Sequence, residues 1–368
     1  LGSRINRGAI VPESSIRVTI ETDDALRFRA DVLVLKHAQA LYGVDGAAYE
    51  KLVDAGTKPK LPKLGAHQAL PSGHALGAYR VLFIGVEPLS EFGYGEIREF
   101  GRRAISILAS YNQSTRHVAL TIHGPGYGLD ETESFESELA GVIEAIAQND
   151  YPDDLEVISF VERDRNRAKR LATVLARLLP KGRLNRTGRG PLSGLDQPAK
   201  QALRTAGYGS ASKPRVFVAM PFSDEMSDIF HYGIQGAVNS AGLLAERADI
   251  ASFTGDVMEW VRTRISGANL VVADLTNANP NVYLEVGYAW GKGVPTVLLV
   301  KSSTDLKFDV RGQRCIVYSS IKELEQKLSN ELNGLIAERK PADEHGTKFV
   351  VTSCCMTSSW CRIGDGLS

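Results

Sequence analysis

The chain has 368 residues, too many for one ordinary hydrophobic core, so two domains are expected. Lysine and arginine together number 43, as do aspartate and glutamate. This balance leaves no net charge to steer the chain toward nucleic acid or an anionic membrane surface, and we expect neither as a partner. No segment has the roughly 18 uninterrupted apolar residues of a membrane helix. Cys315 is the only cysteine before position 354, which favours a reducing, cytoplasmic location.

The first block, residues 12–180, alternates apolar β-type segments with segments of helical spacing. This order predicts a mostly parallel sheet covered by helices. The predicted strands are 15–20, 30–36, 80–86, 117–123 and 155–161, and the predicted helices are 47–55, 96–109, 133–148 and 163–179. Residues 181–212 are basic, contain glycine and proline and show no hydrophobic period, so they are interpreted as a linker.

The second block, residues 213–340, follows the same alternation and predicts a second parallel α/β domain. Its predicted strands are 215–220, 243–246, 269–275, 295–300 and 314–318, and its predicted helices are 224–241, 255–266, 281–291 and 321–336. Residues 341–368 are interpreted as a tail, either native or vector-derived. The predicted fold class is therefore α/β with two domains.

Polar residues of the second block gather where its predicted strands end. Ligands of open parallel sheets bind beyond the carboxyl ends of the strands. Asp274 ends the predicted central strand, and Glu285 lies about one turn into the next helix, so two carboxylates are expected at one cleft. Cleavage of a ribosyl C–N bond passes through an oxocarbenium-like transition state, which a carboxylate can stabilise or attack. The residues expected to bind substrate beside them are Met220, Phe222, Ser223, Asp224, Asp256, Asn279, Asn281 and Tyr283.

A purely structural interpretation of both carboxylates stays open. Asp274 is also suited to cap the turn that follows it, and Glu285 is also compatible with an ordinary helix position. The apolar neighbours of Glu285 favour function, because a buried carboxylate is costly without a partner. No His/Cys/Asp cluster has metal-ligand spacing, so no metal is expected.

Three segments of the second block, 215–222, 269–289 and 294–299, resemble nucleoside 2-deoxyribosyltransferase-like and bacterial TIR-like proteins. Residues 308–311 and 314–318 are similar to the closing segment of the TIR-like proteins. The resemblance implies a flavodoxin/TIR-like parallel fold, with Glu285 as the catalytic carboxylate and Asp274 contacting ribose. It also implies cleavage of a nucleoside, nucleotide or NAD glycosidic bond, in TIR-like members often as NAD-consuming effectors of bacterial antiphage defence.

The first block resembles a macro domain in its strand 30–37, in residues 43–47 and in the glycine loop of residues 121–131. A similar pattern occurs in the amino-terminal domain of leucyl aminopeptidases, often without a ligand. Lys36 and His37 stand where macro domains usually have Asn-Ala-Ala-Asn, which favours binding over ADP-ribosyl hydrolysis. The ligand-sensing residues that the resemblance implies are Asp23, His37, Gly43, Asp45, Gly124, Gly126, Tyr127, Gly128 and Leu129. A lone glycine loop is a weak motif, so a purely structural role stays open.

Together the two resemblances predict an effector in which an ADP-ribose-type nucleotide at the first domain activates an NAD glycohydrolase in the second. NAD is expected as substrate rather than as a bound cofactor, and a homo-oligomer or filament is expected. One alternative is a constitutive nucleotide or deoxynucleoside N-glycosidase or deoxyribosyltransferase. Another is a non-catalytic nucleotide sensor or assembly protein.

Overall fold

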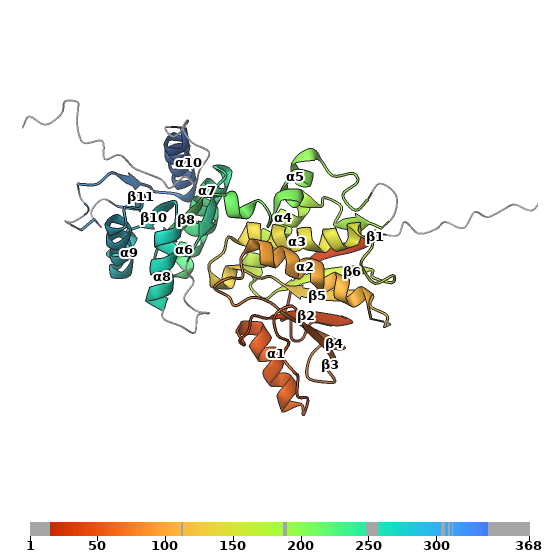
Figure 1. The fold of residues 1–368 in the computed structure, drawn as a ribbon. Helices are drawn as coiled ribbons and strands as arrows, with labels where there is room; N and C mark the ends of the chain where they lie inside the picture. Colours follow the sequence, from red (N-terminus) through yellow and green to blue (C-terminus); the bar gives the residue numbers. More distant parts are fainter. Residues whose placement is uncertain are drawn as a thin grey trace, which may run out of the picture.

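The chain forms two α/β domains, which lie side by side in the computed structural model (Figure 1). The structure describes residues 15–111, 113–186, 190–247, 257–302, 306–307, 310 and 312–337. Each domain is built on one sheet, and the sheets have seven and five strands. The predicted two-domain α/β class is thus confirmed. The predicted tail 341–368 lies outside the described residues.

The N-terminal sheet has the strand order β3-β4-β2-β5-β6-β1-β7. The five inner strands run parallel, and β3 and β7 are antiparallel to their neighbours at the two edges. The bounds of these strands are β1 Ser15–Thr22, β2 Val32–His37, β3 His67–Pro71, β4 Arg80–Gly85, β5 His117–Thr121, β6 Val157–Glu162 and β7 Arg183–Asn185. The carboxyl ends of β2, β5, β6 and β1 therefore share one edge of the sheet.

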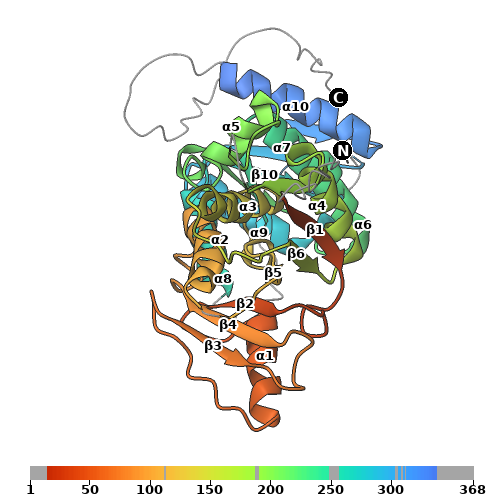
Figure 2. The ribbon, with the colours of Figure 1, turned by 90° about the vertical axis from the view of Figure 1, so that its right-hand side faces the viewer.

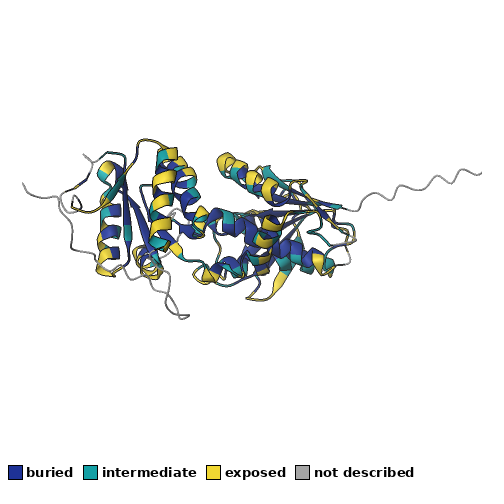
Figure 3. Ribbon diagram, turned by 90° about the horizontal axis from the view of Figure 1, so that it is seen from above, coloured by how far each residue is buried: buried dark blue, intermediate teal, exposed yellow. Residues whose placement is uncertain are grey.

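Helices cover both faces of this sheet because its central strands are apolar on both sides. In β2, Val32 and Val34 pack toward α2 Tyr94–Ala109, α3 Glu131–Ala147 and α4 Arg165–Leu178. The alternate residues Leu33 and Leu35 pack toward α1 Gly43–Asp54 on the other face. All four side chains are buried, as expected for an interior parallel strand. Figure 3 shows buried strands between helices whose outer surfaces are exposed.

Part of the predicted linker belongs to the N-terminal domain. β7 pairs with β1, so residues 183–185 extend the sheet. α5 Gln197–Thr205 begins at the N-cap Asp196, whose Oδ1 accepts from the Ala199 amide. Leu203 on the inner side of α5 is buried in the N-terminal core. The signal that was missed is the amphipathic spacing of this short helix, which lies within a basic, glycine-rich stretch.

The C-terminal sheet has the order β12-β11-β10-β8-β9, and all four of its strand pairs are parallel. Its strands are β8 Arg215–Ala219, β9 Leu244–Glu246, β10 Leu270–Asp274, β11 Thr296–Val300 and β12 Cys315–Val317. Counted within the domain this is the flavodoxin-like order 2-1-3-4-5. The chain reverses direction across the sheet between β8 and β10, and this switch point is where such sheets bind ligands.

Two helical layers enclose the C-terminal sheet. One layer contains α10 Ile321–Ala337 and a continuous helical stretch made of α6 Asp224–Asp228, the π-helix Ile229–Gln235 and α7 Gly236–Ser240. The other contains α8 Val257–Gly267 and α9 Pro280–Gly291. The sequence predicts one regular helix over 224–241, and the π-helical turn within it was not foreseen. Figure 2 shows α10 at the end of the molecule opposite α1. Among the described residues no helix is long and apolar enough to cross a membrane.

Candidate active site and nucleotide-binding loop

Glu285 is a carboxylate without a partner among the described residues, and it lies on α9, the helix that follows the central strand β10. Val282 and Val286 of this helix are buried against the sheet and so set which way the helix faces. The Glu285 side chain is half-buried, and no described residue gives it a hydrogen bond or an ion pair. Burial alone raises the pKa of Glu285 from its ordinary 4.5 to about 7. A carboxyl group of this kind is poised to change its charge near neutral pH.

Asp274 ends β10 and is fully buried. Its Oδ1 accepts the Thr276 amide at 3.0 Å, and its Oδ2 accepts the Tyr318 hydroxyl at 2.7 Å. Burial raises the pKa of Asp274, and these hydrogen bonds oppose the rise. No hydrogen bond joins Asp274 to Glu285. With both oxygens engaged, Asp274 holds the turn after β10 and the β12 end together, and its predicted contact with ribose stays a prediction.

Asn279 is the residue at which α9 begins. Its side chain accepts the Asn281 amide at 2.9 Å as the N-cap of α9, and Pro280 occupies the first helical position. Asn277 adopts a left-handed backbone with φ 62°, a conformation that asparagine tolerates better than most residues. Cap, proline and left-handed asparagine together fix where α9 starts. They therefore fix where Glu285 stands relative to β10.

The other predicted substrate-binding residues differ in their exposure to solvent. Met220 is buried behind β8, whereas Phe222 is 46% exposed and Ser223 and Asn281 are also exposed. Tyr283 is half-buried, and its hydroxyl accepts the Lys307 amide at 3.1 Å. Asp224 is the first residue of α6, and Asp256 lies outside the described residues.

Arg247 is a residue at this edge that the sequence analysis did not single out. It directly follows β9, with its guanidinium 4.3 Å from the Phe230 ring centre and 5.5 Å from that of Phe222. It also lies 4.0 Å from the Met220 sulfur. Ligands of open parallel sheets bind beyond the carboxyl ends of the strands, and this rule applies to β9 as well as to β8 and β10. It would therefore have predicted Arg247.

In the N-terminal domain, the predicted sensing residues near β2 are engaged with the protein. Lys36 forms a buried ion pair with Asp45 at 2.5 Å, and His37 Nδ1 lies 2.9 Å from the Pro62 carbonyl oxygen. Gly43 and Asp45, expected in a glycine loop, instead form the first turn of α1. Gly43 has φ 47°, so a glycine there still serves the sharp entry into this helix.

The glycine loop after β5 was placed correctly by the sequence, between β5 and α3. Gly124 and Gly128 have φ values of 111° and 95°, which side chains rarely tolerate. Gly126 lies in the short 3-10 helix Pro125–Tyr127 between them, and Leu129 behind it is buried. Asp23 follows β1 at the same sheet edge, is exposed and accepts the Asp24 amide at 2.7 Å.

Buried polar atoms without partners concentrate around this loop. Of the ten such side-chain atoms in the described part of the chain, six belong to the loop or to residues beside it. They are Asp45 Oδ1, Thr121 Oγ1, His123 Nε2, Tyr127 Oη, Ser134 Oγ and Glu138 Oε1. An unpaired buried polar group costs about 1–3 kcal/mol. A ligand that offers hydrogen-bond donors and acceptors here would therefore relieve a cost already present in the fold.

The same loop touches the C-terminal domain. A Cβ at Gly128 would lie 2.9 Å from the Trp260 ring and 3.1 Å from the Arg247 carbonyl oxygen, so only glycine fits this approach. Next along the chain, the Asp130 amide donates to the Tyr94 hydroxyl at 2.9 Å. That hydroxyl donates in turn to Glu246 at the end of β9, at 3.1 Å. The predicted sensing loop and the candidate active-site edge are thus joined by direct contacts.

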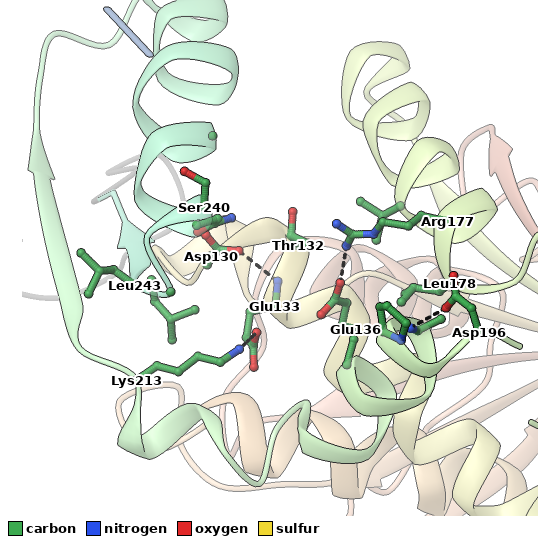
Figure 4. Close-up of a pocket in the computed structure, with 18 residues that line it drawn as sticks. Asp130, Thr132, Glu133, Glu136, Arg177, Leu178, Asp196, Lys213, Ser240 and Leu243 are labelled. Atoms are coloured by element: carbon green, nitrogen blue, oxygen red, sulfur yellow. Dashed lines mark hydrogen bonds and ion pairs between the residues drawn. The ribbon is translucent and has the colours of Figure 1, made fainter. Parts of the chain in front are cut away.

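A cavity of 590 Å³ lies between the domains (Figure 4). α3 contributes Glu133 and Glu136, and both carboxylates are already paired, with Lys213 at 2.5 Å and with Arg177 at 2.6 Å. Burial nevertheless raises the pKa of Glu136 to about 7. Among the described residues, no group of histidine, cysteine or acidic side chains is placed to hold a metal ion. The cavity is therefore lined by apolar residues and by two ion pairs, of which the pair of Lys213 and Glu133 joins the second domain to the first and the pair of Arg177 and Glu136 lies within the first.

No family model and no curated relative matches the chain. Among solved structures it is similar to a CMP N-glycosidase of Clostridium botulinum, with 22% identity over 32% of this chain and 98% of that one and a TM-score of 0.27. It is also similar to two Oceanobacillus iheyensis macrodomain structures. One, a mutant with ADPR, is 15% identical over 46% of this chain and 100% of that one, with a TM-score of 0.34. The other, with MES bound, is 14% identical over 46% of this chain and 98% of that one, with a TM-score of 0.35.

All these identities lie below one quarter and all these TM-scores below one half. We therefore argue the function from the residues of this chain. The predicted resemblances to TIR-like proteins and to the aminopeptidase domain stay predictions.

Proposed function

We propose that the C-terminal domain is an N-glycosidase for a nucleotide-type substrate, with Glu285 as its catalytic carboxylate. The observation that carries this proposal is the half-buried Glu285 carboxyl on the helix that follows the central strand of a flavodoxin-like sheet: it has no partner among the described residues, and its pKa is raised to about 7. A helix residue with a merely structural role has no reason to keep an unpaired carboxyl in this position, because its desolvation weakens the fold.

In the proposed reaction, the ionised Glu285 carboxylate acts on the anomeric carbon as the C–N bond to the base breaks. It either stabilises the developing positive charge or attacks the carbon. The bonding electron pair leaves with the base, and the oxygen of a water molecule ends on the anomeric carbon. The base of a neutral nucleoside takes up the proton that this water releases. The cationic nicotinamide of NAD leaves as a neutral base, so in that case the proton of the water is released to solvent.

We further propose that NAD is the substrate and that an ADP-ribose-type nucleotide at the loop 124–129 activates the enzyme, as in an antiphage effector. Two features support regulation by the first domain. The loop is surrounded by unpartnered buried polar atoms, which a ligand would satisfy. It also packs directly on Trp260 of the second domain, so a change in the loop has a path to the active-site edge.

The test is a mass-spectrometric scan of products from NAD, nucleoside monophosphates and nucleosides, with and without ADP-ribose, alongside Glu285→Gln. Nicotinamide released only with ADP-ribose present, and lost in Glu285→Gln, is the expected result. A free base released from another substrate without ADP-ribose would replace the proposal with a constitutive N-glycosidase. Product formation that persists in Glu285→Gln would remove Glu285 from the chemistry.

A further inference from the structure

Gln235 is the residue through which the π-helix of the C-terminal domain is attached to the N-terminal domain. Its Nε2 donates to Asp130 Oδ2 at 3.0 Å, across the domain boundary, and both side chains are almost fully buried. The other oxygen, Asp130 Oδ1, accepts the Glu133 amide at 2.9 Å and so caps α3. Gln235 Oε1 lies 3.1 Å from Nδ1 of His231, one turn earlier in the π-helix. Every polar atom of this buried link is thereby used.

The link connects two segments that matter for the proposed function. Asp130 directly follows the glycine loop 124–129, at the N-cap of α3. Gln235 is the last residue of the π-helix, which continues from α6, and α6 begins immediately after the substrate loop, residues 220–223. The Met226 amide donates to the Ser223 carbonyl at 3.0 Å, so α6 and the substrate loop are themselves joined.

The π-helix is the element through which this attachment can affect the substrate loop. A π turn holds one residue more than an α turn, and such turns are rare and concentrate at functional sites. If the position of the π turn shifts along a helix, the residues that precede it rotate about the helix axis relative to the residues that follow it. Here the preceding residues are those of α6 and the substrate loop, because the other end of the π-helix is tied to Asp130.

We propose that Gln235 is a positioning residue, through which the N-terminal domain holds the substrate loop of the C-terminal domain in its active arrangement. It touches no reacting atom. It acts by fixing the end of the π-helix to the residue that follows the nucleotide-sensing loop. The inference deepens the proposed function, because it names the path by which the first domain controls the active site.

An exchange of the two functional groups tests the link. Gln235→Glu alone sets two buried carboxylates against each other and breaks the bond. Asp130→Asn with Gln235→Glu restores it with the roles reversed, since the new amide at position 130 donates to the new carboxylate at position 235. The amide oxygen at position 130 still caps α3, and the second carboxylate oxygen at position 235 stays available to His231. Gln201→Glu, which adds the same charge on the exposed side of α5, is the matched control.

Two readouts are measured on the full chain: amide hydrogen exchange of residues 220–240, which requires no substrate, and product formation. We expect Gln235→Glu to speed exchange about tenfold or more in this segment and to lower product formation, and the double variant to restore both. Unchanged exchange in β5 and α10 shows that both domains stay folded. The inference is overturned if Gln235→Glu leaves exchange in residues 220–240 as in Gln201→Glu, or if the double variant restores nothing.

The two readouts also separate this inference from the proposed function. If the wild-type chain releases no product from any substrate, the proposed function fails and the exchange measurement still decides the link. If product is released but amide hydrogen exchange in residues 220–240 is unchanged by the substitutions, the glycosidase proposal is supported and Gln235 has no positioning role.

Discussion

Replacing Glu285 with glutamine should strengthen the fold while it abolishes the chemistry. The rise of the Glu285 pKa from 4.5 to about 7 corresponds to roughly 3 kcal/mol of cost to the folded state when the carboxylate is ionised, at about 1.4 kcal/mol for each pH unit. Solvent reaches part of this side chain and screens its charge, so we expect about 1–2 kcal/mol to be measured. Glutamine keeps nearly the same shape and carries no charge, so Glu285→Gln avoids this cost.

The sign of the effect depends on pH in a way that identifies its cause. Below pH 4.5 the carboxyl is protonated in the folded and unfolded chain, and the cost is absent. As the pH rises from 4.5 through about 7, the unfolded chain releases this proton before the folded one does, and wild-type stability falls. Glu285→Gln should therefore match the wild type near pH 4.5 and exceed it by the full amount at pH 8.

The assay is urea unfolding at both pH values, followed by the fluorescence of Trp260 and Trp290, which both lie in the C-terminal domain. Glu325→Gln on the exposed side of α10 removes an equal charge and serves as the control. Two results would refute the assignment of a desolvated carboxylate at this position. One is a Glu285→Gln variant that is no more stable than wild type at pH 8. The other is a variant whose free energy of unfolding exceeds that of wild type by as much at pH 4.5 as at pH 8.

Three further predictions concern the same machinery. Tyr318→Phe removes the hydroxyl that donates to the buried Asp274 carboxylate at 2.7 Å. The free energy of unfolding in urea should fall by about 1–3 kcal/mol. A variant as stable as the wild type would contradict this hydrogen bond. Gly128→Ala places a Cβ 2.9 Å from the Trp260 ring at a φ of 95°, and the strain should cost about 1–3 kcal/mol. Its Trp260 fluorescence should shift, and an unshifted spectrum would argue against the contact between the domains. The kcat/KM of product release should rise with pH and level off above about 7 as Glu285 ionises, whereas a falling profile would make Glu285 a proton donor.

Local patterns were sufficient to predict the parallel α/β class and the start of α9. Continuous apolar strands such as Val32–His37 follow from burial on both faces of a sheet, and this signal is local. The N-cap Asn279 followed by Pro280 is equally local, so the placement of Glu285 about one turn into a helix held. The edge strands β3 (HQALP) and β7 (RLN) were missed because they contain few apolar residues and no β-branched residue, so their strand pattern is weak.

Neighbouring residues alone predict that Glu285 is a carboxylate on the helix after a parallel strand, because continuous apolar runs and helical spacing are local signals. The folded chain adds that Glu285 is unpaired among the described residues while Asp274 is held by Tyr318, which is 44 residues away along the chain. It alone brought Gln235 to Asp130, which are 105 residues apart. The first contact depends on how β10 and β12 are arranged within one sheet, and the second depends on how the two domains pack. No local pattern encodes either arrangement.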